Sequence, residues 1–111
     1  MPNYCTNQIT IVGHAEDLNV IEREKVYSFF KDVSMTRKDT TLSIKCTTEW
    51  KPPVQFLLKL LELYPRSWIK NAWSEEGGYA GIWIAFNQEQ LKVRDMVWLE
   101  PSGPDDMELL Y

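Results

Sequence analysis

The sequence predicts an α+β fold in which two helices cover one face of a mainly antiparallel sheet. Several short segments alternate between apolar and polar residues, two longer segments have helical periodicity, and adjacent glycines separate two of the strands. A chain of 111 residues, of which 44% are hydrophobic, can bury one core without metal or disulfide support. We therefore expect a single domain over residues 1–100, followed by an acidic tail over residues 101–111.

The first half of the chain is predicted to contain a strand, a helix, a loop and a second strand. They span residues 5–12, 15–31, 34–40 and 41–48 in that order. The strands alternate and are rich in β-branched residues, whereas the helix starts with acidic residues, which are favoured at a helix N-terminus. The inward face of the two strands is then formed by Cys5, Asn7, Ile9, Ile11, Leu42, Ile44 and Cys46, with Asn7 as a polar exception.

The second half begins with a helix that starts at Pro52-Pro53 and stops at Pro65. Three strands follow, and the adjacent glycines Gly77 and Gly78 form a tight turn between the first two. Their expected spans are residues 66–74, 79–87 and 90–99. The element order is β-α-β-α-β-β-β, which predicts a two-layer sandwich of the ferredoxin-like kind.

Four short segments, in order along the chain, resemble those of one family. They read Met-Pro-Asn-Tyr-Cys-Thr-Asn at residues 1–7, Thr-Glu-Trp-Lys-Pro-Pro at 48–53, Tyr-Pro at 64–65 and Glu-Glu-Gly-Gly-Tyr-Ala-Gly at 75–81. In these segments the chain resembles the YubB ferredoxin-like domain family, although Lys51 stands where that family usually has a helix-capping serine. The resemblance extends to about Phe86. It implies a plasmid- or phage-encoded cytosolic protein with a split β-α-β fold, and it carries no catalytic activity with it.

The net charge of −4 comes from the end of the chain. Residues 100–111 contain four acids and no lysine or arginine, so 12 acidic and 12 basic residues remain in residues 1–99. A protein that binds duplex nucleic acid usually has a basic excess, which this composition does not provide. No basic and apolar leader is visible, and no run approaches the roughly 20 apolar residues of a membrane span. We therefore expect no membrane partner and a cytoplasmic location, in the host cell if the protein is phage-encoded.

The sequence contains few residues that could perform catalysis. His14 is the only histidine and stands in a predicted turn, while Cys5 and Cys46 match no zinc or redox spacing. Glu75 and Glu76 are adjacent in a turn, where their side chains are expected to diverge into water. We therefore predict no enzyme activity, no cofactor and no metal site, with a small enzyme of unknown substrate as an alternative.

The face of the sheet without helices is the predicted binding surface. Alternation places Gln8, Thr10, Ser43, Lys45, Trp83, Lys92, Arg94 and Trp98 on it. Aromatic rings among basic and hydroxyl groups are typical of sheets that bind single-stranded nucleic acid. The candidate binding residues are Lys45, Tyr79, Trp83, Lys92, Arg94 and Trp98.

The leading hypothesis from the sequence is a non-enzymatic interaction protein of a mobile genetic element, a phage or a plasmid. It would bind a host or phage protein, in an accessory or counter-defence role. One alternative is the binding of single-stranded nucleic acid on the same face. Another is that the tail residues Leu109, Leu110 and Tyr111, or a second subunit, cover this face.

Overall fold

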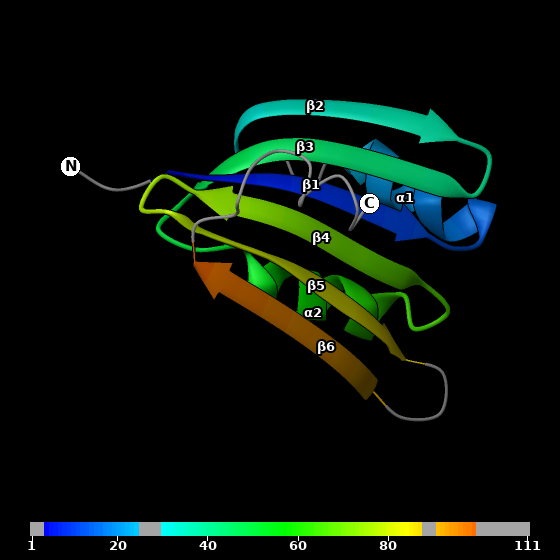
Figure 1. Ribbon diagram of the computed structural model, residues 1–111. Coiled ribbons are helices and arrows are strands. Elements are labelled where there is room, and N and C mark those ends of the chain that lie inside the picture. The colour runs from blue at the N-terminus through cyan, green and yellow to red at the C-terminus, as the bar shows by residue number, and fades with distance from the viewer. Residues whose placement is uncertain (1–3, 25–29, 88–90, 100–111) are drawn as a thin grey trace.

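The part of the chain that the structure describes forms an α+β sandwich of one sheet and two helices (Figure 1). The computed structural model describes residues 4–24, 30–87 and 91–99, with Asn87 and residues 91–99 described by their backbone. The elements are β1 (Tyr4–Val12), α1 (Ala15–Glu24), β2 (Lys31–Lys38), β3 (Thr41–Glu49), α2 (Val54–Leu63), β4 (Trp68–Glu75), β5 (Tyr79–Asn87) and β6 (Leu91–Leu99).

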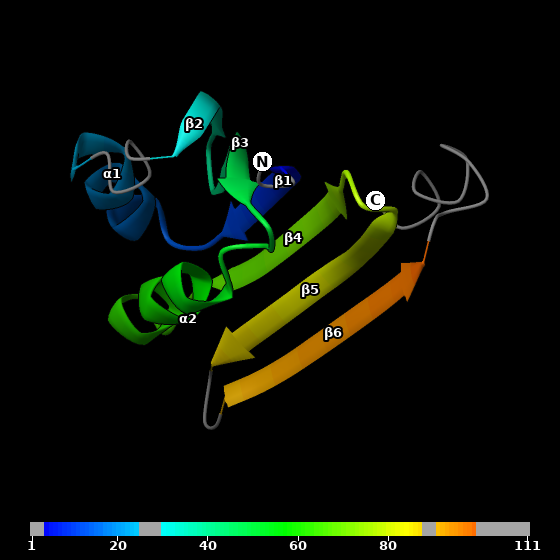
Figure 2. The ribbon, with the colours of Figure 1, turned by 90° about the vertical axis from the view of Figure 1, so that its left-hand side faces the viewer.

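The six strands form one sheet in the order β2-β3-β1-β4-β5-β6, and all neighbouring strands are antiparallel. Both helices lie on the same side of the sheet (Figure 2). The predicted α+β class and the two-layer arrangement are thus confirmed. The predicted tail at residues 101–111 lies outside the described residues.

One strand was not predicted. The sequence indicated a helix over residues 15–31 and a loop over 34–40, but α1 ends at Glu24 and residues 31–38 form the edge strand β2, so the order is β-α-β-β-α-β-β-β. The physical reason is that β2 is only partly buried, so its apolar face is reduced to Val33 and Met35, which pack against the core. The prediction of a loop and the β-α-β-α-β-β-β order were therefore wrong.

Arg37 fixes β2 and α1 to each other. Its Nη1 atom donates hydrogen bonds to Glu22 Oε1 at 2.7 Å and to Asn19 Oδ1 at 2.9 Å, both on α1. Its Nε atom donates to the backbone oxygen of Asp39, at 2.8 Å, in the turn between β2 and β3. The arginine that the sequence assigned to a loop therefore joins three parts of the fold.

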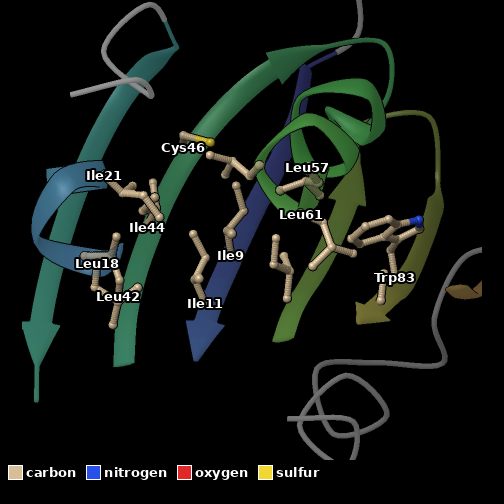
Figure 3. Packing of buried hydrophobic residues seen from close by; sticks show 13 residues of the cluster. Ile9, Ile11, Leu18, Ile21, Leu42, Ile44, Cys46, Leu57, Leu61 and Trp83 are labelled. Atoms are coloured by element: carbon tan, nitrogen blue, oxygen red, sulfur yellow. The ribbon is translucent and has the colours of Figure 1, made fainter. Parts of the chain in front are cut away.

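The core lies between the helices and one face of the sheet (Figure 3). Leu18 and Ile21 of α1 pack over β3, while Leu57 and Leu61 of α2 pack over β4 and β5. The predicted inward residues of β1 and β3 are all buried here. The periodicity of these two strands therefore identified their core face correctly.

The segment between β3 and α2 is built from two tight turns. Lys51 N–H donates to the Glu49 carbonyl at 2.8 Å around Trp50, which has φ 69°, and Val54 N–H donates to the Pro52 carbonyl at 2.9 Å. The second turn leads into α2 at Val54, in agreement with the predicted proline start. Trp50 is 58% exposed.

Candidate interaction surface on the open sheet face

The face of the sheet opposite α1 and α2 is called here the open face (Figure 2). Residues paired on neighbouring strands point to the same side, so the register identifies its members. On β1, β2 and β3 it is a hydroxyl-rich half, made mainly of Thr6, Gln8, Thr10, Ser34, Thr36, Thr41, Ser43, Lys45 and Thr47. On β4 and β5 it is an apolar half, made mainly of Trp68, Ala72, Ala80, Ile82, Ile84 and Phe86. The open face thus combines two different surfaces side by side.

Trp83 does not belong to the open face. It pairs with Asn71 of β4, is 1% exposed, and lies beside Leu61 of α2 in the core (Figure 3). The predicted position of Trp83 was therefore wrong. The cause is that β5 is apolar on both faces, so its alternation alone does not distinguish inside from outside.

The turn between β4 and β5 decides the orientation of β5. Gly78 has φ 97°, a left-handed conformation that glycine adopts without strain, and the hairpin pairs Trp73 with Gly81. Because Trp73 faces the helices, the alternate residues Gly81 and Trp83 face them too. The residues Ile82 and Ile84 are consequently placed on the open face.

The other predicted site residues divide between different places. Lys45 is exposed on the open face, where it pairs with Gln8 and Ser34. Tyr79 is 45% exposed at the start of β5, but it alternates with Ala80 and so belongs to the helix side of the register. The structure thus places Lys45 as predicted and separates Tyr79 from it.

Three predicted site residues lie on β6. In the register of the backbone, Lys92 pairs with Phe86, Arg94 with Ile84 and Trp98 with Ala80. Their backbone positions therefore continue the open face at the edge of the sheet. Their side chains lie outside the described part of the structure, so their role in binding stays a prediction.

Trp68, like Phe86, is an aromatic residue of the open face that the prediction missed. It pairs with Val12 and with Phe86, and it is partly buried. Lys70 follows two residues later on the same face. Ile69 is fully buried on the helix side, so its neighbour Trp68 points to the open face. Alternation along β4 would have placed Trp68 there.

The open face has a local excess of positive charge, although the whole chain has a net charge of −4. In strands β1 to β5, the register places four lysines and one acidic residue on this face: Lys31, Lys38, Lys45, Lys70 and Glu49. Glu49 is paired with Lys31 at 3.7 Å. Lys38 and Lys45 are exposed, and they favour a ligand with negative charge.

A polar network lies on the opposite, buried side of the sheet. Asn7 Nδ2 donates to Thr48 Oγ1 at 2.9 Å, and its Oδ1 accepts a hydrogen bond from Asn71 Nδ2 at 3.0 Å. Thr48 Oγ1 in turn donates to the backbone oxygen of Lys51 at 2.8 Å. Both asparagines are fully buried, and the network ties β3, β1 and β4 together. The polar exception in the predicted first strand is thus structural.

Both cysteines are buried beside this network and have no disulfide. Burial raises the pKa of Cys5 and of Cys46 from 9.0 to about 11, and the nearby Glu75 carboxylate adds to the effect at Cys5. Neutral thiols are poor nucleophiles. This agrees with the prediction that both are core residues.

We expect Ellman's reagent at pH 8 to label neither thiol until the chain is unfolded. Thiols of the unfolded chain ionise near pH 9, whereas those of the folded chain stay protonated until about pH 11. The unfolded state then binds fewer protons, so stability falls as the pH rises through this range. Urea unfolding at pH 8 and pH 10.5 measures the fall, and Cys46→Ala should reduce it. Rapid labelling of the folded chain would contradict the burial of the thiols.

The described residues form no group of three or more His, Cys, Asp and Glu side chains that could hold a metal ion. His14 is exposed in the turn before α1. A surface hollow of about 270 Å³ is lined by Phe30, Lys31, Thr47, Thr48 and Glu49, residues without a general base beside a nucleophile. In the described part of the chain, no helix has the length and apolar character needed to cross a membrane.

Comparisons with known proteins give no relative from which a function could be taken. No family model, no curated protein and no solved structure matches the chain.

Proposed function

We propose that this chain is a non-enzymatic interaction protein that binds a protein partner on the apolar half of its open face. The observation that carries the proposal is the row of Trp68, Ile82, Ile84 and Phe86 on a face that neither helix covers. Trp68, Ile84 and Phe86 keep part of their surface exposed, and adjoining exposed apolar residues are typical of interaction sites. The lysines beside them would attract a partner that combines apolar and acidic side chains.

The origin of the protein belongs to the same proposal. The four sequence segments that resemble the YubB ferredoxin-like domain family support a phage or plasmid protein whose partner is a host or phage protein, in an accessory or counter-defence role. The fold is also proposed to be ferredoxin-like. In support, the first six elements follow a β-α-β-β-α-β order, and their strands are arranged β2-β3-β1-β4, with β5 and β6 added beside β4.

The test is capture from a lysate of the host cell with three versions of the chain. Ile84→Glu places a charge in the apolar half, and Gln55→Glu adds the same charge on the exposed side of α2 as a matched control. Wild type and Gln55→Glu should capture the same protein in stoichiometric amount, and Ile84→Glu should lose it. Equal capture by all three would exclude the apolar half as the binding surface.

Single-stranded nucleic acid is a second candidate ligand, because Trp68 and Phe86 share the face with Lys45 and Lys70. The same capture distinguishes the two ligands. Recovery of nucleic acid, lost after nuclease treatment, would favour this candidate. Recovery of a protein that nuclease does not release would favour the protein partner.

A further inference from the structure

The apolar half of the open face is buried at its centre. Ala80 is fully buried and Ile82 is 4% exposed, although neither helix lies on this side of the sheet. In the register, Ile82 lies between Ala72 of β4 and Met96 of β6. Ile82 therefore marks the centre of the apolar half of the open face.

The composition of the chain after β6 matches this surface in both charge and polarity. Residues 100–111 lie outside the described part of the structure, and their sequence combines four acids with a final Leu109-Leu110-Tyr111. The face offers apolar residues next to Lys45 and Lys70. The apolar residues of the segment therefore match the apolar residues of the face, and its acids match the lysines.

The length of the segment is sufficient. It begins after Leu99, at the end of the edge strand β6. From there, β4 is two strands away and β3 four, or about 10 and 19 Å at ~4.8 Å per strand. An extended chain covers about 3.3 Å per residue, so residues 100–111 could reach roughly 40 Å. Pro101, Gly103 and Pro104 supply residues suited to the turn that this path needs.

We propose that residues 100–111 dock on the apolar half of the open face of the same chain. Leu109, Leu110 and Tyr111 cover the surface around Ile82, and the acids face Lys45 and Lys70. The tail then shields apolar side chains that would otherwise be in contact with water. One consequence rests on the proposed function. If that function holds, a partner must displace the tail, and substitutions in the tail will strengthen the binding of the partner.

The test measures how fast a thiol at position 82 reacts in the full chain. Both native cysteines are buried, so a maleimide should report on the new thiol of Ile82→Cys alone. We expect slow labelling, accelerated at least tenfold when Leu109→Asp and Leu110→Asp are added. Gln55→Cys on α2 is the control, whose rate the tail substitutions should leave unchanged. Thermal unfolding of each variant confirms that it is folded.

Two results would overturn the proposal. A labelling rate that the tail substitutions do not change would mean that the tail does not cover Ile82. A rate that rises on dilution, with the tail intact, would show that a second copy of the chain covers the face. Neither result depends on whether a partner is captured, so failure of this proposal is distinguishable from failure of the proposed function.

Discussion

Replacing Trp83 with alanine is expected to lower the free energy of unfolding by about 3–5 kcal/mol. The indole is 1% exposed and packs in the core cluster with Leu57 and Leu61 of α2. Its removal loses the transfer free energy of a large apolar side chain and leaves a cavity that the neighbours fill only in part. Urea unfolding, followed by circular dichroism, measures the change.

Trp50→Ala is the matched control, since it removes the same side chain from a position that is 58% exposed. We expect this substitution to cost about 1 kcal/mol or less. A Trp83→Ala variant as stable as wild type would contradict the position of Trp83 in the core. It would also restore the earlier expectation that Trp83 acts on the open face.

Replacing Asn7 with alanine is expected to cost about 1–3 kcal/mol, because it leaves buried polar groups without partners. Asn71 Nδ2 loses its acceptor, and Thr48 Oγ1 loses the hydrogen bond that it accepts at 2.9 Å. Both asparagines are fully buried, so water cannot replace the lost contacts without entering the core. Urea unfolding of the variant measures the loss.

The double variant Asn7→Ala/Asn71→Ala tests whether the two asparagines act together. Once Asn7 is absent, Asn71 has already lost its acceptor, so its removal should cost less than it does in wild type. We expect the double variant to be more stable than the sum of the two single losses predicts, by about 0.5–3 kcal/mol. Additive losses would mean that the asparagines stabilise the sheet independently.

The sequence identified those elements whose pattern has one interpretation. The strands β1 and β3 have most of their apolar residues on one face, and α2 is bounded by prolines, so their spans and core faces were predicted closely. The strand β2 was missed because an edge strand needs little apolar surface, and Val33 and Met35 are compatible with a helix as well. Tertiary contacts decide between a helix and a strand in this segment, and the periodicity of the sequence does not report such contacts.

The candidate site was predicted only in part, for a related reason. Lys45 was placed correctly because β3 has a single apolar face. Trp83 was misplaced because both faces of β5 are apolar, so alternation within this strand does not identify the face that points to the core. The register between β4 and β5 decides which face of β5 points to the core. This register is fixed by Gly78 and by the inward position of Trp73, and it cannot be read from alternation within β5.

The helix side of the sheet stabilises the fold, and we propose that the apolar half of the open face binds the partner. The most direct test is the dissociation constant of the captured protein for purified Ile84→Glu, compared with Gln55→Glu. We expect the constant for Ile84→Glu to rise at least about 30-fold, as for a residue that contributes about 2 kcal/mol to binding, while the control matches wild type. An unchanged constant for a folded Ile84→Glu variant would contradict the claim.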